Sequence, residues 1–260
     1  MFTQFGYAEW IGNPEDPIKR KSAGIEKLQR IRLQIEFLMP KIVIPFASFI
    51  YFSHEENFYM NDNQVTSQMV INSNILKAYK DQILFLKPRD ILSLENLNLV
   101  KKTISQYNKS SINHWKMMVA KIKPIYFTSQ KRTELQSIIN NFQQTKIKIS
   151  KNFLFLNCFL QIVGYFKPLK ILLNDYNQII YLSYLENVKF LDKNSNNYDI
   201  EMNSEMLNFT FLNEFGFNTL LVSAKFKAVN EISVEKLRKF FYFLEMFKNG
   251  YRIHSPNRNS

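Results

Sequence analysis

Histidine is the residue type in this chain that most directly suggests metal chemistry, and the chain has three histidines. His54 follows the mostly apolar run 42–52 and opens the polar stretch 54–57. A histidine just past the carboxyl end of a buried parallel strand lies where α/β folds expose functional groups, and imidazole is a common ligand of zinc and iron. We therefore treat His54 as a candidate metal ligand, with a loop histidine satisfied by hydrogen bonds as the alternative. His114, in a helical pattern, and His254, in a polar tail, are expected to be structural or solvated.

Two further groups of residues could be interpreted as catalytic. Cys158 lies in the apolar run 153–159, which favours a small core residue over a nucleophile. Asp199, Glu201 and Glu205 could serve as acid–base groups, but their spacing alone favours a solvated face. No catalytic residue can be assigned from these groups.

The composition predicts a globular chain without a membrane span. Its 260 residues are 46% hydrophobic, enough for a sizeable core in one large or two small domains. No window holds the ~18 uncharged apolar residues that a membrane span needs, and the first residues lack the features of an export signal. A single cysteine excludes an intrachain disulfide and fits a reducing compartment, so we expect a cytoplasmic protein.

The net charge of +12 raises the question of a polyanionic partner. The basic residues are spread along the chain, however, and the tightest basic cluster, residues 19–21, lies at a predicted helix start. We therefore do not expect a nucleic-acid partner.

The first part of the chain predicts alternating helices and strands. Apolar residues recur at helical spacing over 15–39, Pro40 ends this helix, and 42–44 predicts a buried strand. This is the αβ half of a βαβ unit, whose first strand should precede Gly12. Because little chain remains there, we expect the start of the domain to be missing and 42–44 to lie at or near a sheet edge. The pattern then predicts a helix at 74–82, a strand at 83–86 and a helix at 110–122.

The pattern changes near residue 126, where we place a domain boundary. The rest of the chain predicts a long helix at 129–163, strands at 169–173 and 178–185, a polar turn at 193–197, a strand at 220–226 and a closing helix at 233–247. Leu220, Val222 and Phe226 are expected to pack against the closing helix.

Three strings in the first part carry a family resemblance. Residues 2–10 (FTQFGYAEW), 44–49 (IPFASF) and 52–61 (FSHEENFYMN) resemble a bacterial group of metallo-β-lactamase-fold proteins. That group is similar in layout to CMP-N-acetylneuraminate hydroxylase and, more distantly, to N-acyl-phosphatidylethanolamine phospholipase D. In such proteins a helix and a strand precede a late histidine that closes the metal site, and His54 matches that position.

The resemblance implies that residues 1–125 are the C-terminal portion of an αββα metallo-β-lactamase-fold domain. The family carries its main metal ligands on an early His-x-His-x-Asp-His loop, with a further His and a bridging Asp, and no such motif occurs here. His54 with Glu55 and Glu56 cannot supply a dinuclear site. We therefore expect this chain alone to hold no tightly bound Zn or Fe, and we expect the partner to be a separate N-terminal half that carries the motif, unless the chain is a remnant or a truncated product.

The second part also resembles a domain of these proteins. Residues 199–207, 215–220 and 225–226 are similar to their appended C-terminal domain, and the order of elements is similar to a sterol-carrier-type domain, a small α+β fold that can enclose an apolar ligand. The alternative is that the phenylalanines at 209, 211, 215 and 217 simply fill a core. Gly216 is expected to adopt a positive φ.

The predicted fold class is therefore α/β, with a partial αββα metallo-β-lactamase fold at 1–125 followed by a smaller, sterol-carrier-like α+β domain at 126–260. The leading hypothesis is a metal-dependent hydrolase-like protein, truncated or split, that is not catalytically competent alone. With its complement, metal-bound water would attack an ester, amide or phosphodiester-like substrate, and oxidative chemistry stays open. The alternatives are a non-catalytic binding or scaffold remnant, and a lipid or acyl-chain carrier that acts through the C-terminal domain.

Overall fold

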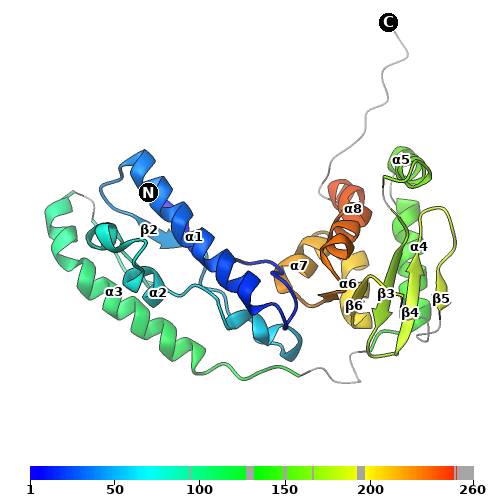
Figure 1. Ribbon diagram of the computed structural model, residues 1–260, viewed down its shortest axis with the longest axis horizontal. Helices are drawn as coiled ribbons and strands as arrows, with labels where there is room; N and C mark the ends of the chain where they lie inside the picture. The colour runs from blue at the N-terminus through cyan, green and yellow to red at the C-terminus, as the bar shows by residue number, and fades with distance from the viewer. Residues whose placement is uncertain are drawn as a thin grey trace, which may run out of the picture. The chain divides into compact units, whose positions relative to one another are not determined.

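The computed structural model describes residues 1–93, 95–126, 132–148, 151–165, 167–191, 197–248 and 250 (Figure 1). The chain divides into two compact units, Met1–Tyr126 (unit 1) and Phe127–Ser260 (unit 2). Each unit combines helices with a sheet that contains a parallel strand pair, which confirms the coarse α/β class. Residues 193–196 of the predicted turn at 193–197 lie outside the described residues. His254 also lies outside them.

Unit 1 begins with a βαβ unit. β1 (Phe2–Gln4) pairs in parallel with β2 (Ile44–Phe46), and α1 (Pro17–Leu38) connects them. The strand expected to precede Gly12 is therefore present. Three residues are enough for β1, because β2 is equally short. The predicted helix 15–39 agrees with α1, where Pro17 occupies a first-turn position at which its missing N–H is not needed.

The segment 42–44 has a neighbour on each side, and because the sheet of unit 1 is so small it still lies next to a sheet edge, within the prediction. The Val43 N–H donates to the Gln82 carbonyl at 2.8 Å, and the Val43 carbonyl accepts from the Leu84 N–H at 2.8 Å, in a parallel bridge between Val43 and Ile83. β1 lies on the other side. Among the described residues of unit 1 the predicted strand 83–86 is reduced to this bridge, and there is no second sheet.

A side chain of α3 (Leu97–Val119) occupies the outer edge of this bridge. Asn108 Oδ1 accepts from the Phe85 N–H at 2.7 Å, and Asn108 Nδ2 donates to the Ile83 carbonyl at 2.9 Å. These are backbone groups on the side of the segment opposite β2, where a further strand would bind. The amide of Asn108 therefore takes the place of a neighbouring strand at this edge.

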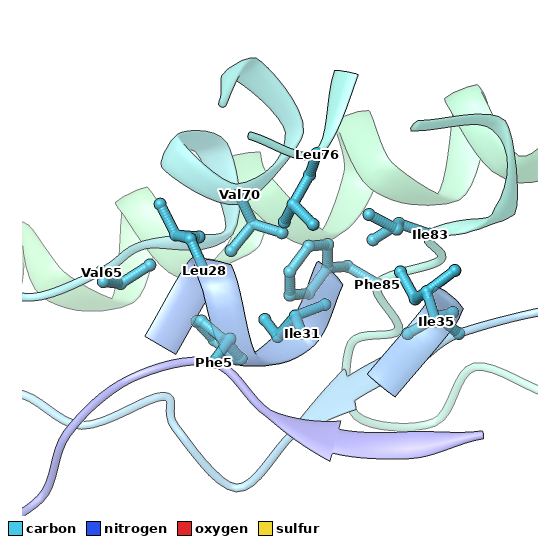
Figure 2. Close-up of a cluster of buried hydrophobic side chains, with 10 residues drawn as sticks. Phe5, Leu28, Ile31, Ile35, Val65, Val70, Leu76, Ile83 and Phe85 are labelled. Atoms are coloured by element: carbon cyan, nitrogen blue, oxygen red, sulfur yellow. The ribbon is translucent and has the colours of Figure 1, made fainter. Parts of the chain in front are cut away.

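Two apolar clusters lie on opposite faces of the βαβ unit. Alternate residues of the strand segments point to each face, which is the strand periodicity of two. Figure 2 shows the cluster on the α1 side, where side chains of α1 gather around Phe85. That cluster contains Phe5, Leu28, Ile31, Ile35, Val43, Val65, Val70, Leu76, Ile83 and Phe85. The cluster on the α3 side contains Ile42, Ile44, Leu84, Val100 and Ile104.

Short helices complete unit 1 between β2 and α3. They are the 3-10 helix η1 (Glu55–Asn61), α2 (Ser67–Asn72) and the 3-10 helix η2 (Lys77–Gln82). The predicted helix at 74–82 is thus confined to η2, and the predicted helix at 110–122 is the second half of the longer α3.

Unit 2 is built around a five-stranded mixed sheet in the order β5-β4-β3-β6-β7. β3 pairs in parallel with β6, and the other neighbours are antiparallel, including the hairpin that β3 and β4 form at the predicted strands 169–173 and 178–185. The elements are α4 (Leu135–Lys148), α5 (Lys151–Ile162), β3 (Leu169–Leu173), β4 (Gln178–Leu182), β5 (Lys189–Leu191), β6 (Ile200–Met202), α6 (Ser204–Leu212), α7 (Gly216–Ser223), β7 (Lys227–Ala228) and α8 (Glu231–Lys248).

One element prediction in unit 2 is wrong, because the strand 220–226 is replaced by α7. The predicted helical segment 129–163 contains α4 and α5, and residues 149–150 between them lie outside the described residues. Phe217, Leu220 and Ala224 are buried at helical spacing, so packing favours a helix over the local strand preference. Val222 is consequently 49% exposed and does not join the core, whereas Phe226 does.

Gly216 has no positive φ, contrary to the prediction. A Cβ added there would lie 2.5 Å from the Thr210 carbonyl oxygen, closer than real Cβ atoms approach. Glycine is therefore required because the start of α7 lies against the backbone of α6.

Candidate functional site

His54 lies after β2, in a backbone segment that is held from two directions. The Ile125 N–H donates to the Ser53 carbonyl at 2.7 Å, and the Glu55 N–H donates to the Ile125 carbonyl at 2.9 Å, which makes a parallel bridge at residue 54. The His54 N–H donates to Asn57 Oδ1 at 3.1 Å, and the Asn57 N–H donates to the His54 carbonyl at 3.1 Å. This reciprocal pair caps η1. The position of His54 is thus fixed, and its side chain is half-buried.

The structure does not bring a full ligand set to His54. Across the residues that it describes, no group of three or more His, Cys, Asp or Glu side chains could hold a metal ion. Glu55 is exposed and Glu56 half-buried on the following turn. Against the effect of burial, the hydrogen bonds and ion pair with Lys87 lower the pKa of Asp90, with a smaller contribution from His114, which lies in α3. The residues present therefore do not fit a complete metal site.

A buried arginine, which the sequence reasoning missed, holds the chain that precedes α1. Arg20 is fully buried, its guanidinium donates to the carbonyls of Asn13 and Pro14, and it lies 4.8 Å from the centre of the Tyr59 ring. Burial raises the pKa of Tyr7 and of Tyr59 from 10.0 to about 12, against the opposing charge of Arg20. Both phenols therefore stay protonated near neutral pH and serve as hydrogen-bond donors.

A small cavity, which we call the aromatic cavity, lies beside the segment that leads to His54. Its volume is about 110 Å³, and the rings of Phe5, Phe49 and Trp115 form part of its wall. Gln64 and Ser67 also line it, and in the described structure Gln64 Oε1 and Ser67 Oγ are buried without a hydrogen-bond partner. The cavity therefore has a partly aromatic wall, and the unpartnered atoms of Gln64 and Ser67 are buried rather than exposed to it.

A larger open groove of about 480 Å³ lies between α3 and the helices α2 and η2. Side chains on one face of α3 bring together lysines that are dispersed in the sequence. The groove is lined by the basic residues Lys80, Lys101, Lys102, Lys109 and Lys116 and by one acidic residue, Asp81. Such a surface attracts anions. Basic residues that are spread along the sequence are thus brought together on this face.

The acidic residues Asp199, Glu201 and Glu205 of unit 2 lie in different surroundings and do not act as one group. Asp199 forms an ion pair with Lys236 at 2.6 Å and accepts the Lys170 N–H at 2.9 Å, which links the sheet to α8. Glu201 is half-buried in β6, and Glu205 is exposed in the first turn of α6. Asp199 therefore has a structural role.

Aromatic rings fill the interior of unit 2 where α4, α6 and α8 meet. Phe142 contacts Tyr184, Phe211 and Phe240, and Phe241 packs on Phe240. The Tyr184 hydroxyl donates to the Phe240 carbonyl at 3.0 Å, and burial raises the pKa of Tyr184 far above its usual range.

Of the four phenylalanines predicted to fill a core, two are buried and two are exposed. Phe211 and Phe217 are buried as predicted, whereas Phe209 and Phe215 are exposed. Cys158 is half-buried, with its Sγ 3.6 Å from the Tyr184 carbonyl oxygen.

In comparisons with known proteins, no protein-family model, no curated protein and no solved structure matches this chain. Of the helices in the described residues, none is long and apolar enough to cross a membrane.

Proposed function

We propose that unit 1 is the C-terminal portion of a metallo-β-lactamase-fold, hydrolase-like protein, and that it contributes His54 to a metal site completed by a separate N-terminal half. The observation that carries this proposal is the fixed position of His54 after the βαβ unit, on a segment anchored by Ile125 and Asn57. That placement is the one expected for a functional group of an α/β fold.

The open side of the small sheet supports the need for a complement. Within the described residues β1 has a strand neighbour on one side, β2, and the opposite side is free to pair. Phe2 and Phe46 contact each other on the same face and are 68% and 48% exposed. Unpaired edges and exposed apolar surface are features that proteins usually cover.

The described residues alone do not fit a site for Zn or Fe, so no catalytic step is assigned to this chain. His54 supplies one imidazole ligand, and a stable site for either metal needs several ligands. The chain is therefore proposed to act within an assembly and not as an independent hydrolase.

Unit 2 is proposed to be a scaffold. Its mixed sheet and helices are compatible with the small α+β domain of the sterol-carrier-like prediction. The interior between α4, α6 and α8 is occupied by the rings of Phe142, Tyr184 and Phe240. This packing favours a structural role over lipid or acyl-chain binding.

The role of His54 can be tested by titrating the isotopically labelled chain with Co²⁺ and recording the imidazole signals by NMR. We expect the His54 signal to broaden at the lowest Co²⁺ concentration, because Glu55 and Glu56 lie beside it, whereas Lys109 and Lys116 repel cations from the helix that carries His114.

The matched variants are His54→Ala and His114→Ala. In His54→Ala, no imidazole signal should broaden at the lowest Co²⁺ concentration. In His114→Ala, the His54 signal should still broaden at that concentration. Equal broadening of the signals of His54 and His114 would remove the case for His54 as the metal ligand.

A further inference from the structure

The open groove between α3 and the helices α2 and η2, which we call the basic groove, carries a concentrated positive charge. Its charged lining residues are Lys80, Lys101, Lys102, Lys109, Lys116 and Asp81. Five lysines and one aspartate leave a net of four positive charges around about 480 Å³. All five lysines are exposed, and in the part of the chain that the structure describes none of them forms an ion pair. Because unneutralised like charges repel one another, a bound polyanion would stabilise this face.

Three of these lysines form a regular row along α3. Lys102, Lys109 and Lys116 follow one another at intervals of seven residues, close to two helical turns. Each interval therefore corresponds to about 10.5 Å along the helix, and the row is about 21 Å long. A single phosphate or carboxylate group cannot contact a row of this length. The row fits a linear ligand that repeats its negative charge.

The other residues of the groove favour a phosphate backbone over an acidic peptide. Neutral side chains that can donate hydrogen bonds, Gln68, Ser105 and Asn113, are exposed beside the lysines. Lysine, serine, asparagine and glutamine are residue types that contact the phosphate oxygens of nucleic acids. Acidic and phosphorylated peptide motifs are instead commonly held by clusters of arginine, and no arginine is among the described residues that line the groove.

The lining residues also indicate that the bases are not recognised. Among the described residues of the groove none is aromatic, so it offers no surface on which a base can stack. Lysines clustered along one helix are the electrostatic footprint of a protein that binds nucleic acid through its backbone.

We propose that the basic groove binds the phosphate backbone of single-stranded nucleic acid without regard to base sequence. The dispersal of basic residues along the sequence argued against such a partner, and the fold removes that argument by bringing five of them to one groove. The inference does not rest on the metal role of His54.

The probe is a fluorescein-labelled thymidine 20-mer, whose binding to the full chain is followed by fluorescence anisotropy at several salt concentrations. We expect saturable binding. The logarithm of the association constant should fall with the logarithm of the salt concentration at a slope of about −2 to −3.5, as for three to five lysines that neutralise phosphates of a single strand. A mixed-sequence 20-mer should bind within about threefold of the thymidine strand, because stacking does not contribute.

The variant Lys102→Gln/Lys109→Gln removes two charges from the row. It should make the salt slope shallower by about 1.4 and weaken binding about 25-fold at 0.1 M salt. The matched control is Lys21→Gln/Arg30→Gln, which removes two charges from exposed positions of α1 that do not line the groove. The control should change the affinity less than about twofold. Circular dichroism spectra identical to that of the unaltered chain verify that both variants fold.

A peptide of twenty glutamates is the competing polyanion. It should bind at least about tenfold more weakly than the strand, because its carboxylates are on flexible side chains whose ordering costs entropy. Tighter binding of the peptide would overturn the assignment to nucleic acid. Absence of strand binding, or an equal loss of affinity in the groove variant and the control, would show that the basic groove is not the binding site.

Discussion

Arg20 links α1 to the chain that precedes it, because its buried guanidinium donates to two backbone carbonyl groups of that chain. Its guanidinium bonds to Asn13 and Pro14 and stacks on Tyr59, so one side chain fixes both the loop and an aromatic ring. Arginine suits this position because its planar fork presents several donors in a fixed geometry.

The variant Arg20→Lys should lower the free energy of unfolding by about 1.5–3 kcal/mol, because the ammonium group cannot replace both charge-assisted bonds and the stacking contact. Arg30→Lys is the matched control, since Arg30 is exposed on the same helix, and it should change stability by less than about 0.5 kcal/mol. Urea unfolding measures both. Equal stability of the two variants would contradict this role for Arg20.

The burial of Arg20 could have been predicted from its spacing. Residues 20, 24, 28, 31 and 35 form the buried face of α1, and that helical series places Arg20 on the same face as Leu28 and Ile31. The basic cluster 19–21 instead indicates a solvated helix start. His54 could be named from the sequence, because it follows an apolar run directly, but its anchoring by Ile125 could not, because that contact joins distant segments.

At the scale of elements, Asn108 shows how a helix can complete a sheet. Its amide bonds to the Ile83 carbonyl and the Phe85 N–H, and a carboxylate could accept from Phe85 but could not donate to Ile83. The edge of the strand segment therefore depends on an amide at this position.

The variant Asn108→Asp should destabilise unit 1 by about 2 kcal/mol or more, because it removes a buried donor and places a charge in the interior. The Phe85 amide proton should exchange faster with solvent. Asn113→Asp, an exposed change on the same helix, should leave both quantities almost unchanged. Urea unfolding measures the stability, and hydrogen exchange measures the rate at the Phe85 amide. Equal stability and equal exchange rates in the two variants would show that Asn108 does not hold the edge.

Elements with strong periodicity could be predicted, and elements formed by tertiary contacts could not. α1, the β3–β4 hairpin and α8 follow patterns that extend over many residues. β1 is three residues long and leaves no recognisable pattern. The apolar run 220–226 predicts a strand where α7 lies, because a run this short does not distinguish a buried helix from a strand without knowledge of its packing.

At the scale of the whole molecule, the two units have cores of different character. Unit 1 has mainly aliphatic clusters on the two faces of its βαβ unit, one of which also contains Phe5 and Phe85, whereas unit 2 has a cluster of aromatic rings. The aromatic cavity could not be predicted, because Phe5, Phe49, Gln64 and Trp115 come from separate parts of unit 1.

Separate cores predict separate responses to core truncation. Ile31→Ala should lower the stability of unit 1 by about 2–5 kcal/mol, and Phe240→Ala should lower that of unit 2 by about 3–5 kcal/mol, since both side chains are fully buried. Hydrogen exchange followed by mass spectrometry should show faster exchange mainly in peptides of the altered unit. Equal acceleration in both units would show that they unfold as one cooperative body.

The central claim, that this chain presents His54 as one ligand of an incomplete metal site, is tested most directly by its metal content. The purified chain is dialysed against excess Zn²⁺ and then against metal-free buffer, and bound zinc is measured by elemental analysis with His54→Ala and His114→Ala in parallel. We predict well under one equivalent of retained zinc in all three proteins, because one imidazole cannot hold the ion. Retention of nearly one equivalent that is lost in His54→Ala and kept in His114→Ala would contradict the claim, since the chain would then contain a complete site.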